Sequence, residues 1–250
     1  ALRSHYYMHI LLVLTWSVAV WPLFHAVQSD AAGFAIRITP WEYFRSQFGV
    51  IGHYLSLVLW PAELCLDYYW PVAMDPWAIW PWFVVLLAAG VATLILLWKR
   101  PMMGFLGAWF FIVLGPTSSF VPVIDLAFEH RMYLPLLGVL AVLAVAATAL
   151  WERLQWSQRW GAILLAVLIL ALGARTWWRN LDYLDATTMW AKVVEQRPDN
   201  PRARNNLAVE LNAQEEHEAA LVHLVHALKV NPHYDRIHLN TAVTLIQLDR

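Results

Sequence analysis

The chain has 250 residues, of which 60% are hydrophobic and only 14% are charged, and its formal net charge is −1 at pH 7. Soluble domains carry about 25% charged residues; here the shortfall lies before residue 180, and the rest of the chain has an ordinary soluble composition. The balanced charge gives no support for a nucleic-acid partner, and a single cysteine excludes an internal disulfide. A membrane domain followed by a water-exposed domain is therefore predicted.

Long apolar runs predict helices that cross a membrane. A spanning helix needs about 20 mainly apolar residues, and four runs meet this length well or nearly so: 7–24, 79–98, 133–151 and 160–178. Tryptophans flank these and neighbouring runs, as they do in the aromatic belts at membrane interfaces. These are Trp21, Trp60, Trp80, Trp82, Trp98, Trp151, Trp160, Trp177 and Trp178.

Two further apolar runs are shorter, and each meets a proline. Residues 102–114 cross only if the chain beyond Pro116 completes the passage, and irregular backbone there would be buried in protein or line a wet cavity. Residues 48–60 end before Pro61. We interpret residues 34–66 as an interfacial or re-entrant segment, with a true span over 47–66 as the alternative. About five spanning helices are expected in all.

Basic residues in short loops predict the orientation in the membrane. Lys99 and Arg100 form one turn, and Arg153 and Arg159 flank another. Both turns are expected on the cytoplasmic side. The loops around residues 67–77 and 116–131, and the chain after Trp178, are then expected outside the cytoplasm.

The C-terminal part of the sequence repeats itself after 34 residues. The matching pairs are Ala186 with Ala220, Pro198 with Pro232, Asn206 with Asn240, Ala208 with Ala242, and Leu211 with Leu245. Thirty-four residues is the period of the tetratricopeptide repeat (TPR), a pair of packed helices. Residues 180–250 are predicted to hold one complete repeat, 201–234, and two partial ones. A plain helical hairpin is the alternative.

Within the complete repeat, residue size predicts the packing. Small Ala208 and Ala220 let the two helices approach, and Pro232 ends the second helix. The seam is expected to be filled by Leu207, Leu211 and Leu224. Glu215 stands where such turns usually have glycine. Because about three or more repeats are needed to cover their open faces, we expect a parent protein that continues past Arg250.

Ionisable residues gather in the two predicted outer loops. Segment 115–135 reads GPTSSFVPVIDLAFEHRMYLP, with Glu129, His130 and Arg131 directly before a predicted span. Arginine suits phosphate, and Glu129 and His130 are suited to proton transfer or to orienting a ligand. The alternative is an interfacial charge cluster that only anchors the helix.

The other loop, residues 60–71, reads WPAELCLDYYWP. Asp67, with Tyr68 and Tyr69, is a candidate for a sugar-binding or metal-binding pocket, and a solvated loop aspartate is the alternative. The sequence has no zinc signature, no glycine-rich phosphate loop and no nucleophile elbow, so we predict no metal site.

The order of these features resembles a known family. Membrane helices, the loop LWPAELCLDYYWPVA, the segment EHRMYLP and a TPR array together resemble the transmembrane and TPR-containing O-mannosyltransferases, and more closely their bacterial relatives. The resemblance implies that residues 1–179 are the C-terminal half of a C-type glycosyltransferase membrane core. Such enzymes move a sugar from a polyprenyl-phosphate donor to a protein hydroxyl outside the cytoplasm.

The resemblance also implies roles for particular residues. Family members have a Glu–Arg pair shortly before a Tyr. In this chain Glu129, Arg131 and Tyr133 match these three residues, and His130 stands between the Glu and the Arg. Arg131 and His130 would bind the donor phosphate. The supporting polar and aromatic residues would be Glu129, Tyr133, Asp67 and Tyr68. The family's catalytic carboxylate lies upstream of this fragment, so its catalytic residue is unknown.

The sequence thus predicts an all-α, multi-pass protein of a bacterial inner membrane, with extracytoplasmic TPRs. Its expected function is protein O-glycosylation, with a lipid-linked sugar as substrate and no certain cofactor. The expected partners are membrane lipids, the lipid-linked sugar, and a protein or peptide acceptor held by the TPRs. A non-catalytic TPR scaffold in the membrane is the rival from another class. Paired acidic residues in an upstream outer loop would favour the enzyme.

Overall fold

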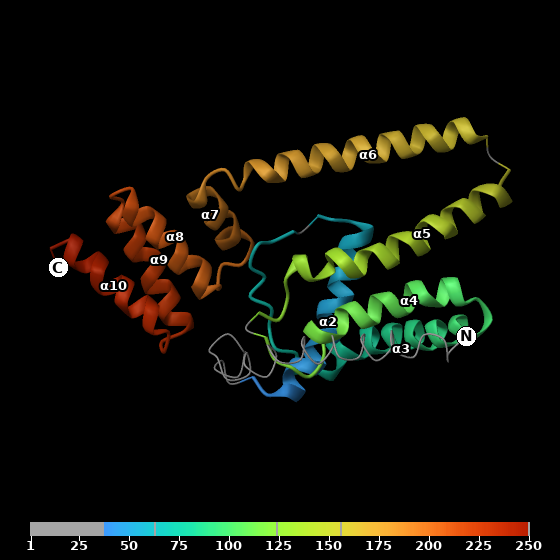
Figure 1. The fold of residues 1–250 in the computed structure, drawn as a ribbon. Helices are drawn as coiled ribbons and strands as arrows, with labels where there is room; N and C mark the ends of the chain where they lie inside the picture. The colour runs from blue at the N-terminus through green and yellow to red at the C-terminus, as the bar shows by residue number, and fades with distance from the viewer. Residues whose placement is uncertain (1–37, 63, 124, 156, 250) are drawn as a thin grey trace, which may run out of the picture. The chain divides into compact units, whose positions relative to one another are not determined.

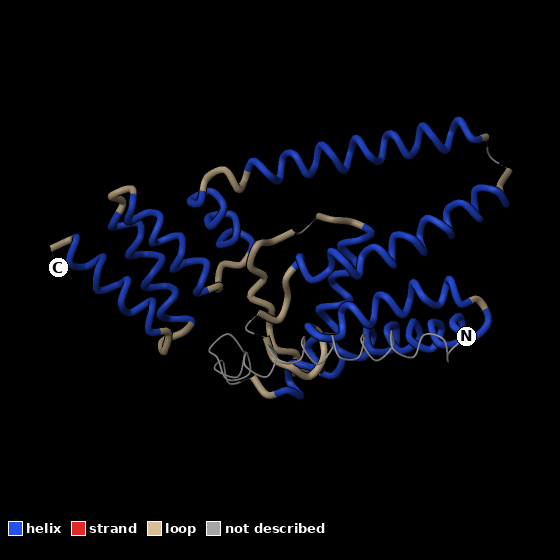
Figure 2. Tube along the Cα trace, in the orientation of Figure 1, coloured by secondary structure: helices blue, strands red, loops and turns tan. Residues whose placement is uncertain are grey.

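A computed structural model describes residues 38–249, with gaps at 63, 124 and 156. The elements of this part of the chain are α-helices and two short 3-10 turns, without a β-strand (Figures 1 and 2). Contacts within the chain divide it into two compact units. Unit 1 comprises residues 1–62 and 70–139, and unit 2 comprises residues 63–69 and 140–250. The predicted boundary at 179/180 stays a prediction, and the predicted span 7–24 lies outside the described residues.

Unit 1 is built on three helices and an irregular loop: α2 (Pro40–Leu59), α3 (Pro76–Lys99), α4 (Pro101–Leu114), and the loop that follows them to the start of α5 (Tyr133–Arg153). The helix α2 begins at a capping box, in which Thr39 Oγ1 accepts from the Glu42 N–H and the Glu42 carboxylate accepts from the Thr39 N–H at 2.9 Å. This arrangement satisfies two backbone donors that a helix start leaves open.

Close approach of α3 and α4 depends on a glycine. A Cβ atom at Gly104 would lie 2.2 Å from the backbone nitrogen of Leu97, so a larger residue would push the two helices apart. Next along the chain, α5 touches α4, because the Trp109 indole N–H donates to the Leu134 carbonyl at 2.8 Å. A small residue thus sets the contact of α3 with α4, and a hydrogen bond joins α4 to α5.

Three described helices are long and apolar enough to cross a membrane: Pro76–Lys99, Glu129–Arg153 and Gln158–Leu181, the last being α6. They contain three of the predicted spans. The run 102–114 forms α4 and continues in a 3-10 turn at Gly115–Thr117, and it belongs to the shorter apolar helices. The helix α2 is not among the three candidates, and its interfacial or re-entrant placement stays a prediction.

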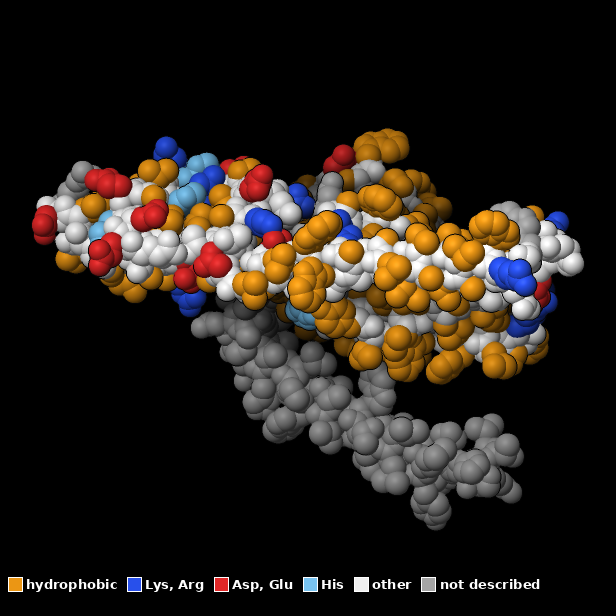
Figure 3. Space-filling view, turned by 90° about the horizontal axis from the view of Figure 1, so that it is seen from above, with side chains coloured by type: hydrophobic (Ala, Val, Ile, Leu, Met, Phe, Trp, Pro, Cys, Tyr) orange, Lys and Arg blue, Asp and Glu red, His pale blue; other side chains and the backbone are white. Residues whose placement is uncertain are grey.

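The long helices bury very little of their surface. Only Leu86 and Thr93 of α3 are buried, and α6 buries none of its residues. In Figure 3, hydrophobic side chains cover the long helices, whereas charged ones are frequent on the helices that follow residue 185. Apolar surface of this kind is stable in lipid, where it faces hydrocarbon. The sequence and the helices together support a membrane protein.

Unit 2 ends in four short helices: α7 (Ala186–Gln196), α8 (Pro201–Ala213), α9 (His217–Val230) and α10 (Asp235–Gln247). A shared core contains every residue predicted to pack between the helices of the complete repeat. This cluster is Leu207, Ala208, Leu211, Ala220, Leu224, Ala227 and Ile237. The helix α9 ends before Pro232, as predicted, and Glu215 has a φ of 65° in the turn where glycine was expected. The packing is confirmed; the TPR assignment itself stays a prediction.

Candidate functional site

One face of α2 holds the irregular loop that precedes α5. Tyr43, Gln47 and Tyr54 are spaced four and seven residues apart, which puts them on one side of a helix, and each is at most 2% exposed. The Tyr43 hydroxyl donates to the Thr117 carbonyl at 2.7 Å, and Tyr54 accepts from the Phe128 N–H at 2.6 Å. The polar face of α2 therefore fixes the course of residues 117–128.

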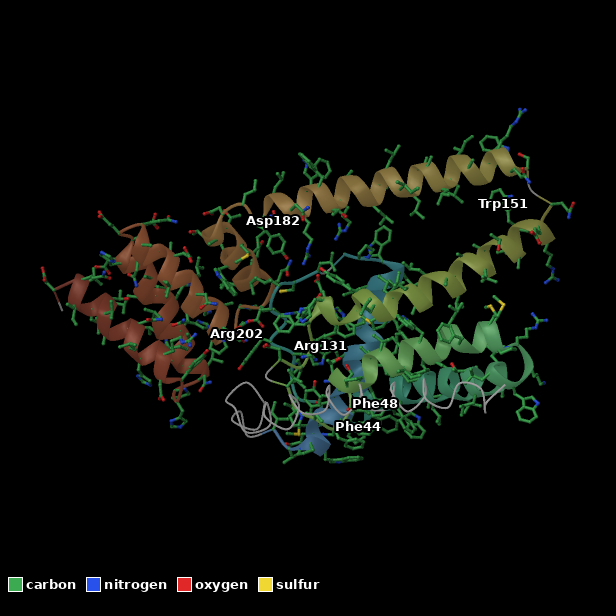
Figure 4. The ribbon with its side chains drawn as sticks, in the orientation of Figure 1. Phe44, Phe48, Arg131, Trp151, Asp182 and Arg202 are labelled. Carbon is green, nitrogen blue, oxygen red and sulfur yellow. The ribbon has the colours of Figure 1, made fainter. Side chains whose placement is uncertain are left out.

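Arg131 fastens the same loop from its other end. Its Nη1 donates to the Tyr43 hydroxyl at 3.2 Å and to the Leu126 carbonyl at 3.1 Å, and it lies 3.4 Å from the Thr117 carbonyl. Its Nη2 donates to the carbonyl of Asp125. Figure 4 shows Arg131 in this loop, before α5. The guanidinium thus binds four oxygen atoms drawn from α2 and from the loop.

The hydrogen bonds of Arg131 use only some of the N–H donors of its guanidinium. A guanidinium has five N–H donors, and within the described residues the Nε–H and one Nη2 hydrogen of Arg131 make no hydrogen bond. Carbonyl oxygens carry no net charge, so these hydrogen bonds do not neutralise the positive charge of Arg131. These hydrogen bonds hold the loop, and whether Arg131 only anchors it or also binds an anion stays a prediction.

The other predicted residues of this segment lie in one 3-10 turn, Glu129–Met132, or directly after it. His130 is exposed, and its ring lies 4.9 Å from that of Phe128. Tyr133 is 72% exposed, and Glu129 is partly buried. Sequence proximity therefore places His130 and Tyr133 beside Arg131, with their side chains accessible.

Two buried polar atoms near this loop have no hydrogen-bond partner in the described part of the chain. They are Oε1 of Gln47, whose amide nitrogen donates to the Leu126 carbonyl at 3.3 Å, and Oγ of Ser118. Such atoms are rare in native proteins and commonly mark a bound water or ligand. The loop is therefore the candidate ligand site of unit 1.

Asp67 lies in unit 2, where an arginine of α8 binds it. Arg202 Nε donates to Asp67 Oδ2 at 2.6 Å, and the Asp67 side chain is only 7% exposed (Arg202 is labelled in Figure 4). The Tyr69 N–H donates to Oδ1, and Asn200 Nδ2 donates to the Asp67 carbonyl, both at 3.3 Å. The alternative of a solvated loop aspartate is therefore wrong.

Tyr68 is buried beside Asp67. It is 1% exposed, and the guanidinium of Arg197 lies 5.8 Å from the centre of its ring. Its hydroxyl accepts from the Cys65 N–H at 3.2 Å. The six predicted site residues thus fall into two groups, with Glu129, His130, Arg131 and Tyr133 at one loop and Asp67 and Tyr68 at another.

Comparison with known proteins identifies relatives of the chain. It is 28% identical over 145 residues to "Protein O-mannosyl-transferase Tmtc3" of Drosophila melanogaster. These aligned residues are 57% of this chain and 16% of that protein. The match to Drosophila Tmtc1 is 33% over 115 residues, 45% of this chain and 13% of that protein. Human TMTC3 is 26% identical over 141 residues, 54% of this chain and 15% of that protein. The chain is a distant relative of these protein O-mannosyl-transferases.

The relatives are much longer than the aligned region, so the chain spans only a small part of their length. No family model matches the chain, and no solved structure is similar to it. The comparison supports the predicted family at a distant level and a glycosyltransferase role in general. A bacterial source and the C-type membrane core stay predictions.

Sequence reasoning missed the polar face of α2. Its signal was present in the spacing of Tyr43, Gln47 and Tyr54, which repeats along one side of a helix. The partners of these residues could not be predicted, because they are backbone atoms of an irregular loop more than 70 residues away, as in the pair Tyr43 and Thr117 (74 residues apart).

Proposed function

We propose that the chain is part of a membrane-bound protein O-glycosyltransferase that takes its sugar from a polyprenyl-phosphate donor. The observation that carries this proposal is the similarity to proteins named protein O-mannosyl-transferases, in a chain whose helices are able to cross a membrane. A C-type glycosyltransferase core in a bacterial inner membrane accounts for the apolar helices. The helix pairs of unit 2 act as extracytoplasmic TPRs that recruit the acceptor protein.

Arg131 is proposed to stabilise the phosphate of the donor. Hydrogen bonds to three carbonyls and to the Tyr43 hydroxyl hold the guanidinium in one position before any ligand binds, and a fixed cation stabilises charge that develops on a leaving phosphate. His130 lies in the same turn and is exposed, so it can add a second donor to the phosphate. The donor needs no further cofactor in this scheme.

Asp67 and Tyr68 are proposed to support the acceptor side. Because Arg202 and Asn200 hold Asp67, the residues around it form a rigid element of unit 2. Rigid elements position a bound substrate more accurately than free loops.

Transfer of sugar by the full-length protein tests the role of Arg131. Arginine offers a planar fork that lysine lacks, so Arg131→Lys should raise the KM for the polyprenyl-phosphate donor by about tenfold or more. Arg100→Lys, in the exposed turn between α3 and α4, is the matched control and should leave the KM unchanged. Retention of the helical circular dichroism signal and of the gel-filtration profile checks folding.

Two results would decide against these roles. If Arg131→Ala folds and keeps the wild-type donor affinity, Arg131 only anchors the loop. If the full-length wild-type protein transfers no sugar from any polyprenyl-phosphate donor but still binds proteins through unit 2, the scaffold alternative is correct.

A further inference from the structure

A pocket of unit 2 lies where α6 ends and α7 begins. Its walls come from the end of α6 and the residues after it, from α7, and from residues 64–66, which belong to the same unit. The empty volume is about 320 Å³, and Asp182 of its wall is labelled in Figure 4. Ligand pockets usually measure about 300–1,000 Å³, so this one suits a small chemical group.

The wall of this pocket carries more positive than negative charge. Arg179 and Lys192 supply two cations, and Asp182 supplies one carboxylate. Lys192 Nζ forms an ion pair with Asp182 Oδ1, and Arg179 Nη2 donates to the Tyr183 hydroxyl at 3.1 Å. An ammonium group has three N–H donors, and Lys192 uses one of them within the described residues. Donors and net positive charge are thus present for an anion.

The deeper wall of the pocket is apolar. Cys65 and Val193 are 4% and 3% exposed, whereas the side chains of Lys192 and Asp182 are 48% and 30% exposed. The charged groups therefore lie at the more open part of the pocket, beside a surface that excludes water. Attraction between charges is stronger beside such a surface than in bulk water.

The pocket adjoins the end of a candidate membrane span. The helix α6 has 24 residues, which extend over about 36 Å, and the hydrocarbon core of a membrane is about 30 Å thick. The end of α6 therefore reaches the headgroup layer. Trp177 and Trp178, both 70% exposed, stand in its last two turns, as is typical of the membrane interface. The anions most abundant at this level are lipid phosphates.

We propose that this pocket binds the headgroup phosphate of an anionic phospholipid. Lys192 and Arg179 donate to the phosphate oxygens, in hydrogen bonds that charge on both partners strengthens. Asp182 holds Lys192 in place through their ion pair. Basic pockets bordering membrane helices recognise lipid headgroups in this way. A lipid bound here ties the start of α7 to the membrane surface.

The proposal goes beyond sugar transfer and does not rest on it. None of the residues of the pocket belongs to the loop of Arg131, and lipid binding is measured without a sugar donor. If transfer fails while lipid binding depends on Arg179 and Lys192, the lipid site stands and the enzymatic function does not. If transfer succeeds and no anionic lipid binds, the lipid site is wrong and the enzymatic function stands.

Native mass spectrometry of the full chain in detergent, titrated with phosphatidylglycerol, gives the Kd of the first bound lipid. Arg179→Gln and Lys192→Gln should each weaken this binding about tenfold, because each removes a charged donor. Phosphatidylcholine, which has no net charge, should bind more weakly to the wild type and equally to all variants.

Asp182→Asn separates the lipid site from a purely structural ion pair. If the pocket binds an anion, removal of its carboxylate should strengthen phosphatidylglycerol binding about fivefold, because a repulsive charge is lost. If the ion pair only joins α6 to α7, this variant loses stability and its lipid affinity does not rise. Thermal unfolding of each variant measures the stability separately.

Arg159 supplies the matched control, since it is an exposed cation at the other end of the same helix. Arg159→Gln should change the Kd by less than about twofold. Inorganic phosphate, added at millimolar concentration to the lipid-bound chain, distinguishes a lipid headgroup from a free ion and should not displace the lipid.

Four results would overturn the proposal. The first is equal binding of the two lipids by the wild type, and the second is wild-type affinity in Arg179→Gln and Lys192→Gln. The third is a loss in Arg159→Gln as large as in the pocket variants, which would assign the binding to general surface charge. The fourth is displacement of the lipid by inorganic phosphate, which would assign the pocket to a soluble ion.

Discussion

The contact of α2 with its loop and the contact of α8 with α9 each hold two segments together, but the first adds buried hydrogen bonds to its aromatic packing, whereas the second has an apolar core. In unit 1 the buried side chains Tyr43 and Gln47 hydrogen-bond to backbone carbonyls, while the outer surface of α3 is apolar. In unit 2 the buried side chains Ala220 and Leu224 pack against apolar neighbours. Apolar burial drives association only where water is the competing solvent. In lipid, hydrogen bonds and close contact of small groups take over that role.

One arginine of each unit shows a similar difference in its hydrogen-bond partners. Arg131 donates to carbonyl oxygens and a phenol, and keeps its charge available. Arg202 instead donates to the carboxylate of Asp67. A carboxylate–arginine pair is suited to fixing a segment in place, whereas a cation whose hydrogen bonds go to neutral oxygens is suited to binding an anion.

The largest effect is expected in the apolar core of unit 2. Leu224 is fully buried, so Leu224→Ala should lower the free energy of unfolding by about 2–5 kcal/mol. Val222 is 67% exposed on the same helix, and Val222→Ala should have little effect. Hydrogen exchange of the α8 and α9 amides in urea measures both variants. Equal losses would contradict the packing of the two helices.

A smaller effect is expected at the polar contact of unit 1. Tyr43→Phe removes a hydroxyl that donates to Thr117 and accepts from Arg131, which should cost about 0.5–1.5 kcal/mol. Faster hydrogen exchange of residues 117–128 reports the loss. Tyr133→Phe changes a side chain that is 72% exposed and serves as the control. Unchanged exchange in Tyr43→Phe would mean that the loop is held by Arg131 and Tyr54 alone.

The smallest effect is expected in the pH dependence of the stability of unit 2, which contains His223. Burial, and then the nearby Arg204 and His226, lower the pKa of His223 below its usual value of 6.5. The folded chain therefore favours the neutral ring, whereas the unfolded chain takes up a proton near pH 6.5. The stability that this shift contributes is present above that pH and is lost as the pH falls below it.

Unfolding of unit 2 at pH 7.5 and pH 5 measures this dependence. The wild type should lose more stability on acidification than His223→Gln, whose side chain does not titrate. The effect is modest, because the ring is only partly buried and the solvent screens its charge. An equal loss in both proteins would assign the pH dependence to other groups.

Much of the helical architecture could be predicted from the sequence, because it depends on patterns that are local. The length of an apolar run predicted the helices α3, α5 and α6. The spacing of small and large residues predicted that Ala208, Ala220 and Leu224 would share a core. These patterns are reliable because helix geometry fixes which side chains share a face.

The candidate sites were less accessible to such reasoning. Arg131 was identified by its residue type and position, but its partners are carbonyl oxygens whose directions depend on an irregular loop. Asp67 was identified as a polar residue in an aromatic loop, and its partner Arg202 lies 135 residues further along the chain. No periodic pattern links residues at such a separation.

The sequence by itself determined where the long apolar helices form, which of them are apolar enough for lipid, and which side chains of the predicted repeat are buried. Each of these follows from the order of residue types along a few turns of chain. Only the tertiary structure decided that Arg131 donates hydrogen bonds to Tyr43 and to three carbonyls, and that Asp67 forms an ion pair with Arg202 of α8. The physical reason is that such contacts join backbone and side-chain atoms whose positions are set by the packing of distant segments.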